Sequence, residues 1–117
     1  HESISFMFYN FKNLRNKRNG FVRTSSLEAF GYSWKLLLHP RGNNRSSTEV
    51  EHISCHLVYV GDAKYKPAVK YSFRCKDHSA GFTVIRVFTT EKMWGFVDYL
   101  EREDVLENYL DEDGTLV

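Results

Sequence analysis

Two cysteines and two histidines have the spacing of metal ligands. His52 precedes Cys55 by three residues, and Cys75 precedes His78 by the same interval. Four-ligand zinc sites use sets of this kind. However, both pairs lie in segments that alternate apolar and polar residues, and residues three apart on a strand point to opposite faces. We therefore predict two buried thiols and two surface imidazoles, and we expect no metal and no other cofactor.

Other segments resemble catalytic or ion-binding motifs only in part. Asp111–Gly114 begins like a calcium-binding EF-hand loop, but the bidentate glutamate about six residues past the glycine is missing. We expect a turn there. The sequence contains no Gly-x-Ser-x-Gly turn and no glycine-rich phosphate loop. The chain could therefore be an enzyme only without a recognisable catalytic motif.

A basic segment near the N-terminus could bind phosphate groups. It contains Lys12, Arg15, Lys17 and Arg18, with Arg23 nearby, and binding through such residues would depend strongly on salt. No aromatic residue interrupts it and no helix is predicted to present it, so we expect a solvated loop. The formal net charge of +1 also argues against a nucleic-acid or membrane partner. Charge is uneven along the chain, since residues 91–117 carry nine acidic and two basic side chains.

The string Trp94-Gly95-Phe96 places two large aromatic residues around a glycine. Such rings usually fill a core, and we expect this of one of them. Burial of both is less expected, because an indole N–H needs a hydrogen-bond partner.

The elements that position these residues follow from composition and periodicity. The 117 residues, 42% of them apolar, suffice for one core, so residues 1–117 form one domain. With two cysteines, no long apolar stretch and no signal peptide, we expect an intracellular protein, cytoplasmic or nuclear. The chain starts without Met and ends in an apolar segment, so we take it as a module of a longer protein.

Period-two alternation between glycine-rich or polar loops predicts strands. The alternation is most regular over Glu51–Val60, where it predicts a strand with one buried face. A helical period follows at Trp94, Val97 and Leu100, which predicts a short helix near residues 93–103, and a second turn runs from Asp104 to Leu110. The whole pattern favours an antiparallel β-sandwich. The predicted strands are Ile4–Tyr9, Phe21–Leu27, Tyr32–Leu38, Glu51–Val60, Val69–Lys76 and Phe82–Thr90.

Six short motifs in order give the chain a resemblance to the MATH domain, the fold at the C-terminus of TRAF-type adaptors. The resemblance covers nearly the whole chain and implies an all-β, seven- to eight-stranded antiparallel sandwich. The motifs are Asn10-Phe11, Phe30–Leu36 leading to His39–Gly42, Ile53–Leu57, Val69–Phe73, Trp94–Phe96, and Asp104–Leu106 with Tyr109-Leu110.

This resemblance implies a non-catalytic module that binds short extended peptides in a shallow groove by strand addition. It would recruit partners for a ubiquitin-pathway protein, either a ligase adaptor or a deubiquitinase. An alternative is a TRAF-like assembly module, oligomeric in the full-length chain, although the isolated domain is expected to be monomeric because it has no heptad repeat. The groove residues carried over by position are His56, Tyr71, Arg86, Met93, Trp94 and Phe96.

Three of these positions depart from the family pattern. Speckle-type POZ adaptors carry aromatic residues where this chain has His56 and Arg86, which predicts a preference for acidic or phosphorylated peptides and pH sensitivity near pH 6.5. Other relatives carry aspartate where this chain has Met93. Because a thioether is a weak acceptor, we expect little selectivity for peptide Ser or Thr hydroxyls.

Overall fold

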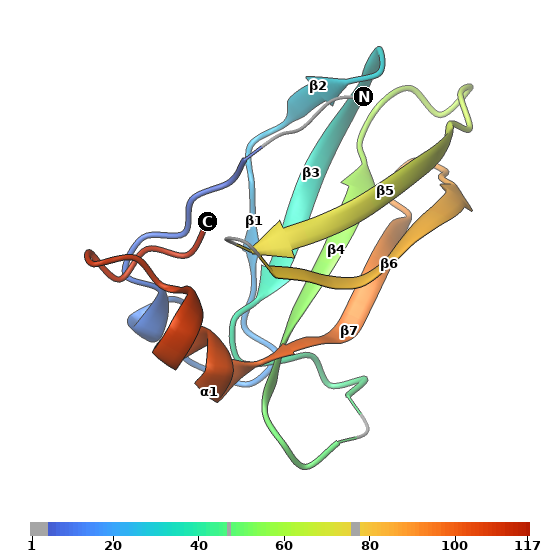
Figure 1. The fold of residues 1–117 in the computed structure, drawn as a ribbon. Coiled ribbons are helices and arrows are strands. Elements are labelled where there is room, and N and C mark those ends of the chain that lie inside the picture. Colours follow the sequence, from blue (N-terminus) through green and yellow to red (C-terminus); the bar gives the residue numbers. More distant parts are fainter. Residues whose placement is uncertain (1–4, 47, 76–77) are drawn as a thin grey trace.

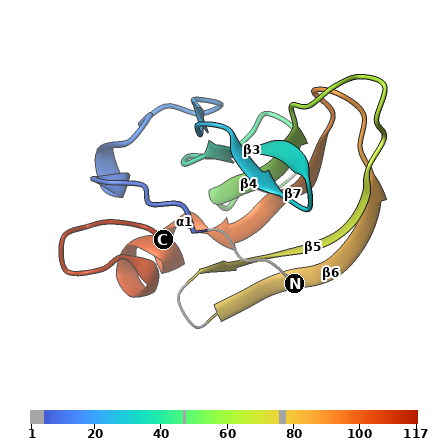
Figure 2. The same ribbon diagram turned by 90° about the horizontal axis from the view of Figure 1, so that it is seen from above.

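A computed structural model describes residues 5–46, 48–75 and 78–117 of the chain. Two antiparallel sheets pack face to face (Figures 1 and 2). The first has the strand order β1-β3-β4-β7, with β2 also pairing with β3, and the second consists of β5 and β6. The strands are β1 Val22–Arg23, β2 Leu27–Ala29, β3 Tyr32–His39, β4 His52–Tyr59, β5 Ala68–Cys75, β6 His78–Val87 and β7 Met93–Glu101.

The helical elements are short and lie at one end of the sandwich (Figure 1). A 3₁₀ turn, η1, covers Phe11–Asn13, and α1 covers Arg102–Asp104. A π-helical turn, η2, continues from α1 over Val105–Tyr109. The described chain contains no helix that is long and apolar enough to cross a membrane.

The predicted β-sandwich is confirmed, and its central strands lie close to where the alternation placed them. The alternation of β5 is confirmed as well, because its inward residues Val69, Tyr71 and Phe73 are more buried than the residues between them. Two N-terminal predictions were wrong. Phe21–Leu27 is divided between β1 and β2. Among the described residues of the predicted first strand, only Phe8 pairs, through an isolated bridge to Leu116.

The helix predicted near residues 93–103 is in fact strand β7 as far as Glu101. The apolar spacing imitates a helical period, but the segment pairs with β4, with Trp94 opposite Leu57 and Gly95 opposite His56. Glycine is required at that point, because a Cβ on Gly95 would lie 2.1 Å from a backbone oxygen of β4. The pairing between distant segments therefore overrides the local pattern.

Strand β4 also differs from its prediction, because both of its faces are buried. Ile53 and Cys55 face the core as expected, but Ser54 and His56 on the other face are also enclosed. Covering segments come from elsewhere in the chain: the ring of Phe21 lies 5.8 Å from that of His39, the partner of Ser54 on β3. A period-two pattern with polar residues on one face does not reveal such a cover.

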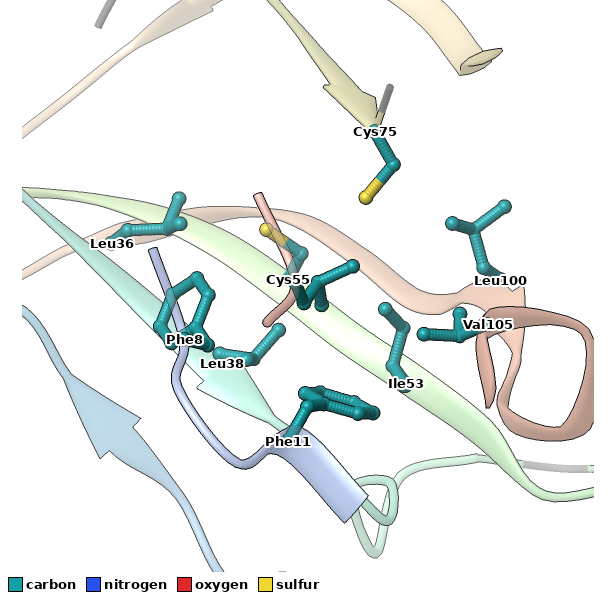
Figure 3. Close-up of a cluster of buried hydrophobic side chains, with 10 residues drawn as sticks. Phe8, Phe11, Leu36, Leu38, Ile53, Cys55, Cys75, Leu100 and Val105 are labelled. Atoms are coloured by element: carbon teal, nitrogen blue, oxygen red, sulfur yellow. The ribbon is translucent and has the colours of Figure 1, made fainter. Parts of the chain in front are cut away.

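The core between the sheets contains two clusters. Figure 3 shows the larger one, which includes Phe8, Phe11, Ile53 and Val105 together with Cys55 and Cys75. The second cluster is aromatic and contains Trp34, Tyr59 and Phe88, with Ala29. An open cleft of about 790 Å³ remains between the sheets, and its walls include side chains from both clusters.

Cys55 and Cys75 are both buried, as the sequence predicted. Burial raises the pKa of Cys75 to about 11 and that of Cys55 further. Neither side chain is therefore a reactive thiolate near neutral pH. Among the residues with described side chains, no group of three or more His, Cys, Asp or Glu could hold a metal ion. The side chain of His78, the fourth candidate ligand, lies outside the described part of the chain.

Candidate functional site

Strand β7 is the last strand of the first sheet, and the residues around it form the candidate site. On one side β7 pairs with β4, while no described strand pairs with its other edge. Strand β6 of the second sheet approaches this strand (Figure 1), and the Trp94 side chain reaches its last residue, Val87. An unpaired edge exposes backbone N–H and C=O groups, so it can accept an added strand.

Trp94 lies at the start of this edge, where it bridges the two sheets. Its indole Nε1 donates a hydrogen bond to the carbonyl of Val87 at the end of β6, over 3.1 Å. The half-buried ring packs against the aromatic cluster that contains Trp34 and Phe88. This hydrogen bond provides the acceptor that a partly buried indole N–H needs, and it fixes the orientation of the ring.

Two cations lie over the Trp94 ring. The guanidinium carbon Cζ of Arg86 is 5.1 Å from the ring centroid, and Nζ of Lys92 is 4.7 Å from it. Both distances are within the range of cation–π attraction. Arg86 is one of the predicted groove residues. Lys92 was not predicted, because nothing in the sequence shows that its side chain would fold back over the ring of a residue two positions further on.

Phe96 and Tyr71 belong to one aromatic row on the inner faces of the two sheets. Phe96 on β7 lies 6.1 Å, ring to ring, from Phe73 on β5, and Phe73 lies 5.5 Å from Tyr71. The structure therefore connects two predicted residues through Phe73, which the prediction of the groove omitted. The alternation Val69, Tyr71, Phe73 had already placed Phe73 on the same face as Tyr71, and this was the signal that could have identified it.

Met93 lies on the opposite face of β7 from Trp94, because successive residues of a strand alternate. It pairs with Val58, which is buried, yet Met93 itself is 42% exposed. The side chain is accessible beside the unpaired edge. A peptide added along that edge could contact it.

His56 does not reach this site, in contrast to the sequence prediction. It points to the face of β4 opposite Leu57 and is only 7% exposed. The Ser54 hydroxyl lies 3.4 Å from Nδ1 of His56 and 3.5 Å from Nδ1 of His39. Burial, followed by the charges of His39 and Arg45, lowers the pKa of His56 to about 4. Its imidazole is therefore neutral at pH 6.5 and cannot supply the expected pH sensitivity of binding.

The remaining sequence candidates lie elsewhere. Asp111–Gly114 forms a turn, as predicted, in which Oδ1 of Asp111 accepts from the backbone N–H groups of Asp113 and Thr115. In the basic segment, Lys12, Arg15, Lys17 and Arg18 are exposed on a loop and the turn η1. Neither region is adjacent to the β7 edge in sequence or by strand pairing.

The sequence matches the family model of the MATH domain over residues 4–117. This match spans almost the entire chain, so the protein belongs to the MATH domain family. No curated protein matches the chain in a direct sequence comparison. MATH domains are protein-interaction modules, and this family membership agrees with an all-β sandwich that has an unpaired edge strand.

Proposed function

We propose that this domain binds short extended peptides along the free edge of β7, between β7 and β6. The observation that carries the proposal is the combination of an unpaired edge with an indole fixed beside it. A peptide would pair its backbone with β7, and its side chains would contact Trp94, Phe96 and Tyr71, with Met93 on the other side of the strand. Backbone pairing supplies affinity in this mode, and side-chain contacts supply selectivity.

The affinity should be modest. One added strand covers a small area, and interfaces at the small end of the range are transient. We expect dissociation constants on the order of 10 μM to 1 mM.

Replacement of Trp94 tests the location of the site. Trp94→Ala should weaken peptide binding at least about 30-fold, since anchoring aromatic residues of interfaces carry about 2 kcal/mol or more. The fold should persist, because the ring is only half-buried. Tyr9→Ala, which removes an exposed aromatic side chain from the N-terminal segment, is the matched control. For both variants, we would measure binding to a randomised peptide array and the temperature of thermal unfolding.

If Trp94→Ala unfolds the domain, the residue is a core residue. A loss of about 3–5 kcal/mol of unfolding free energy would indicate this. If Trp94→Ala folds and binds peptides like the wild type, the site lies elsewhere and the proposal is wrong.

N-methylation of a bound peptide tests strand addition itself. In an antiparallel pair the N–H groups of alternate residues point toward the partner strand. Methylation of every second backbone nitrogen should therefore abolish binding, while methylation at the positions between them should have little effect. Equal sensitivity at all positions would contradict pairing with β7.

We further propose that the domain recruits partners for a ubiquitin-pathway protein. The resemblance of its motifs to the MATH domain of TRAF-type adaptors, together with the match to the MATH family model, supports this role. The sequence that flanks the domain in the full-length protein provides the test. A BTB, RING or protease segment would support the proposal, and a different class of attached domain would contradict it.

A further inference from the structure

We infer that the Trp94 end of the site selects peptides with an anionic side chain, a carboxylate or a phosphate, which is bound by Arg86 and Lys92. This inference rests on the proposed function and names the chemistry of its ligand. The sequence argument for such a preference relied on His56 and Arg86, and the structure replaces His56 with Lys92. That histidine is buried on the other face of the sheet, whereas Lys92 lies at the edge with Arg86.

The two cations are held in place over the indole ring. The indole of Trp94 is fixed by its hydrogen bond to Val87, and both cations lie within about 5 Å of its centroid. Arg86 Nη1 also donates a hydrogen bond to the backbone carbonyl of Ile85, over 3.0 Å. Lysine and arginine side chains otherwise lose much conformational freedom when they bind a ligand. Contacts with the ring reduce that cost before an anion arrives.

In the described part of the chain, no carboxylate pairs with either of these cations. Both side chains are exposed, and neither Arg86 nor Lys92 takes part in an ion pair within the described ranges. The neighbouring carboxylate, Glu91, pairs with Arg23. By contrast, Arg41 binds both carboxylate oxygens of Glu51. A guanidinium can bind a carboxylate or a phosphate through two N–H groups.

The loops near these two cations carry more basic than acidic side chains. The loop between β4 and β5 meets the turn before β7, where Thr90 Oγ1 donates to the carbonyl of Gly61 over 3.2 Å. This loop contributes Lys64 and Lys66 and one carboxylate, that of Asp62. Together with Arg86 and Lys92, the lysines leave an excess of positive charge at this end. Such a surface attracts acidic segments and disfavours basic ones.

A set of peptides that differ at one position tests the inference. A peptide that binds the wild-type domain on a randomised ten-residue array is resynthesised with glutamate, phosphoserine, serine or lysine at each position in turn. At one or two positions we expect the glutamate or phosphoserine form to bind at least about tenfold more tightly than the lysine form. The glutamate and phosphoserine forms separate a carboxylate ligand from a phosphate ligand.

Charge reversal provides the matched variant. In the double variant Arg86→Glu/Lys92→Glu, the lysine peptide should bind more tightly than the glutamate peptide. The control is Lys70→Glu/Arg74→Glu, which makes the same change of net charge on the outer face of β5, where both residues are exposed. This control should keep the preference of the wild type.

The outcomes distinguish the inference from the proposed function. If the wild type binds peptides without any charge preference, or if both double variants behave alike, the inference is overturned and the β7 site stands. If no peptide in the array binds, the proposed function fails and the inference fails with it. The comparison of glutamate and lysine peptides on the wild-type domain tests the charge preference without any variant. The experiment is therefore decisive even if a variant does not fold.

Discussion

The two ends of β7 both place a cation over an aromatic ring, but one end is closed and the other is open. Just after β7, Arg102 lies with its Cζ 5.4 Å from the ring of Phe11 and is only 5% exposed. At the start of β7, Arg86 and Lys92 lie over Trp94 and remain exposed. The same pair of chemical groups thus occurs in two different environments.

At the closed end, the hydrogen-bonding groups of the arginine are engaged by the protein itself. Arg102 Nη1 donates to the carbonyl of Pro40 over 2.6 Å, and Nη2 donates to that of Lys12 over 3.0 Å. Its Nε lies 3.7 Å from a carboxylate oxygen of Glu51. Three distant segments are held together in this way. A buried cation with complete partners stabilises a fold, whereas an exposed cation without an ion pair can bind a ligand.

Loss of the buried arginine should have the largest effect. Arg102→Met should lower the free energy of unfolding by about 3 kcal/mol or more, because two backbone carbonyls lose their charged donor and Glu51 loses an ion-pair partner. Arg86→Met, at the exposed end, should cost no more than about 1 kcal/mol. Denaturant unfolding of both variants measures the difference. Equal losses would show that the two ends are not distinct.

Acidification should reveal a second closed region, the face of the first sheet opposite Trp94. The pKa of His56 is lowered from 6.5 to about 4, so folding favours its neutral form. Above pH 6.5 its contribution to stability is complete, and it is lost as the pH falls from 6.5 toward 4. The loss could reach about 3 kcal/mol.

His56→Gln should flatten this dependence of stability on pH, and urea denaturation between pH 4 and 7 measures it. The remaining slope belongs to other groups, including His39, whose pKa is also lowered by burial. A wild-type stability that does not change over this interval would mean that His56 is accessible to water. It would then remain a candidate for the open region.

The smallest predicted change concerns selectivity for peptide hydroxyl groups at the open end of β7. Met93→Asp should introduce a carboxylate that accepts a hydrogen bond from a peptide hydroxyl, which is worth about 1.5 kcal/mol. The variant should therefore prefer a serine-containing peptide over its alanine analogue by about tenfold, whereas the wild type should show little preference. Isothermal titration with the two peptides measures both ratios. A strong serine preference in the wild type would show that another group binds the hydroxyl.

Local periodicity was sufficient to predict much of the fold but less of the site. The alternation of β4 and β5 follows from the requirement that one face of each strand meets the core, and both strands were predicted closely. Trp94 and Phe96 were predicted as site residues from the resemblance to the MATH domain, in which the string Trp94-Gly95-Phe96 is one of the matching motifs. The structure places both at the unpaired edge strand.

Errors arose where distant segments determine the environment. The strand state of β7 depends on pairing with β4, and the burial of His56 depends on covering segments that no local pattern specifies. The position of Lys92 over Trp94 depends on a side-chain conformation. These features depend on contacts between segments remote in sequence, or on side-chain rotamers. The period of the apolar residues gives no information about either.

Backbone NMR of the ¹⁵N-labelled domain tests the central claim most directly. Titration with the tightest-binding peptide of the array should shift the amide signals of residues 93–96 and the indole N–H signal of Trp94. Signals from Phe11 and Arg102, at the closed end, should not move. Shifts confined to the closed end, or to the walls of the cleft between the sheets, would contradict binding at the free edge of β7.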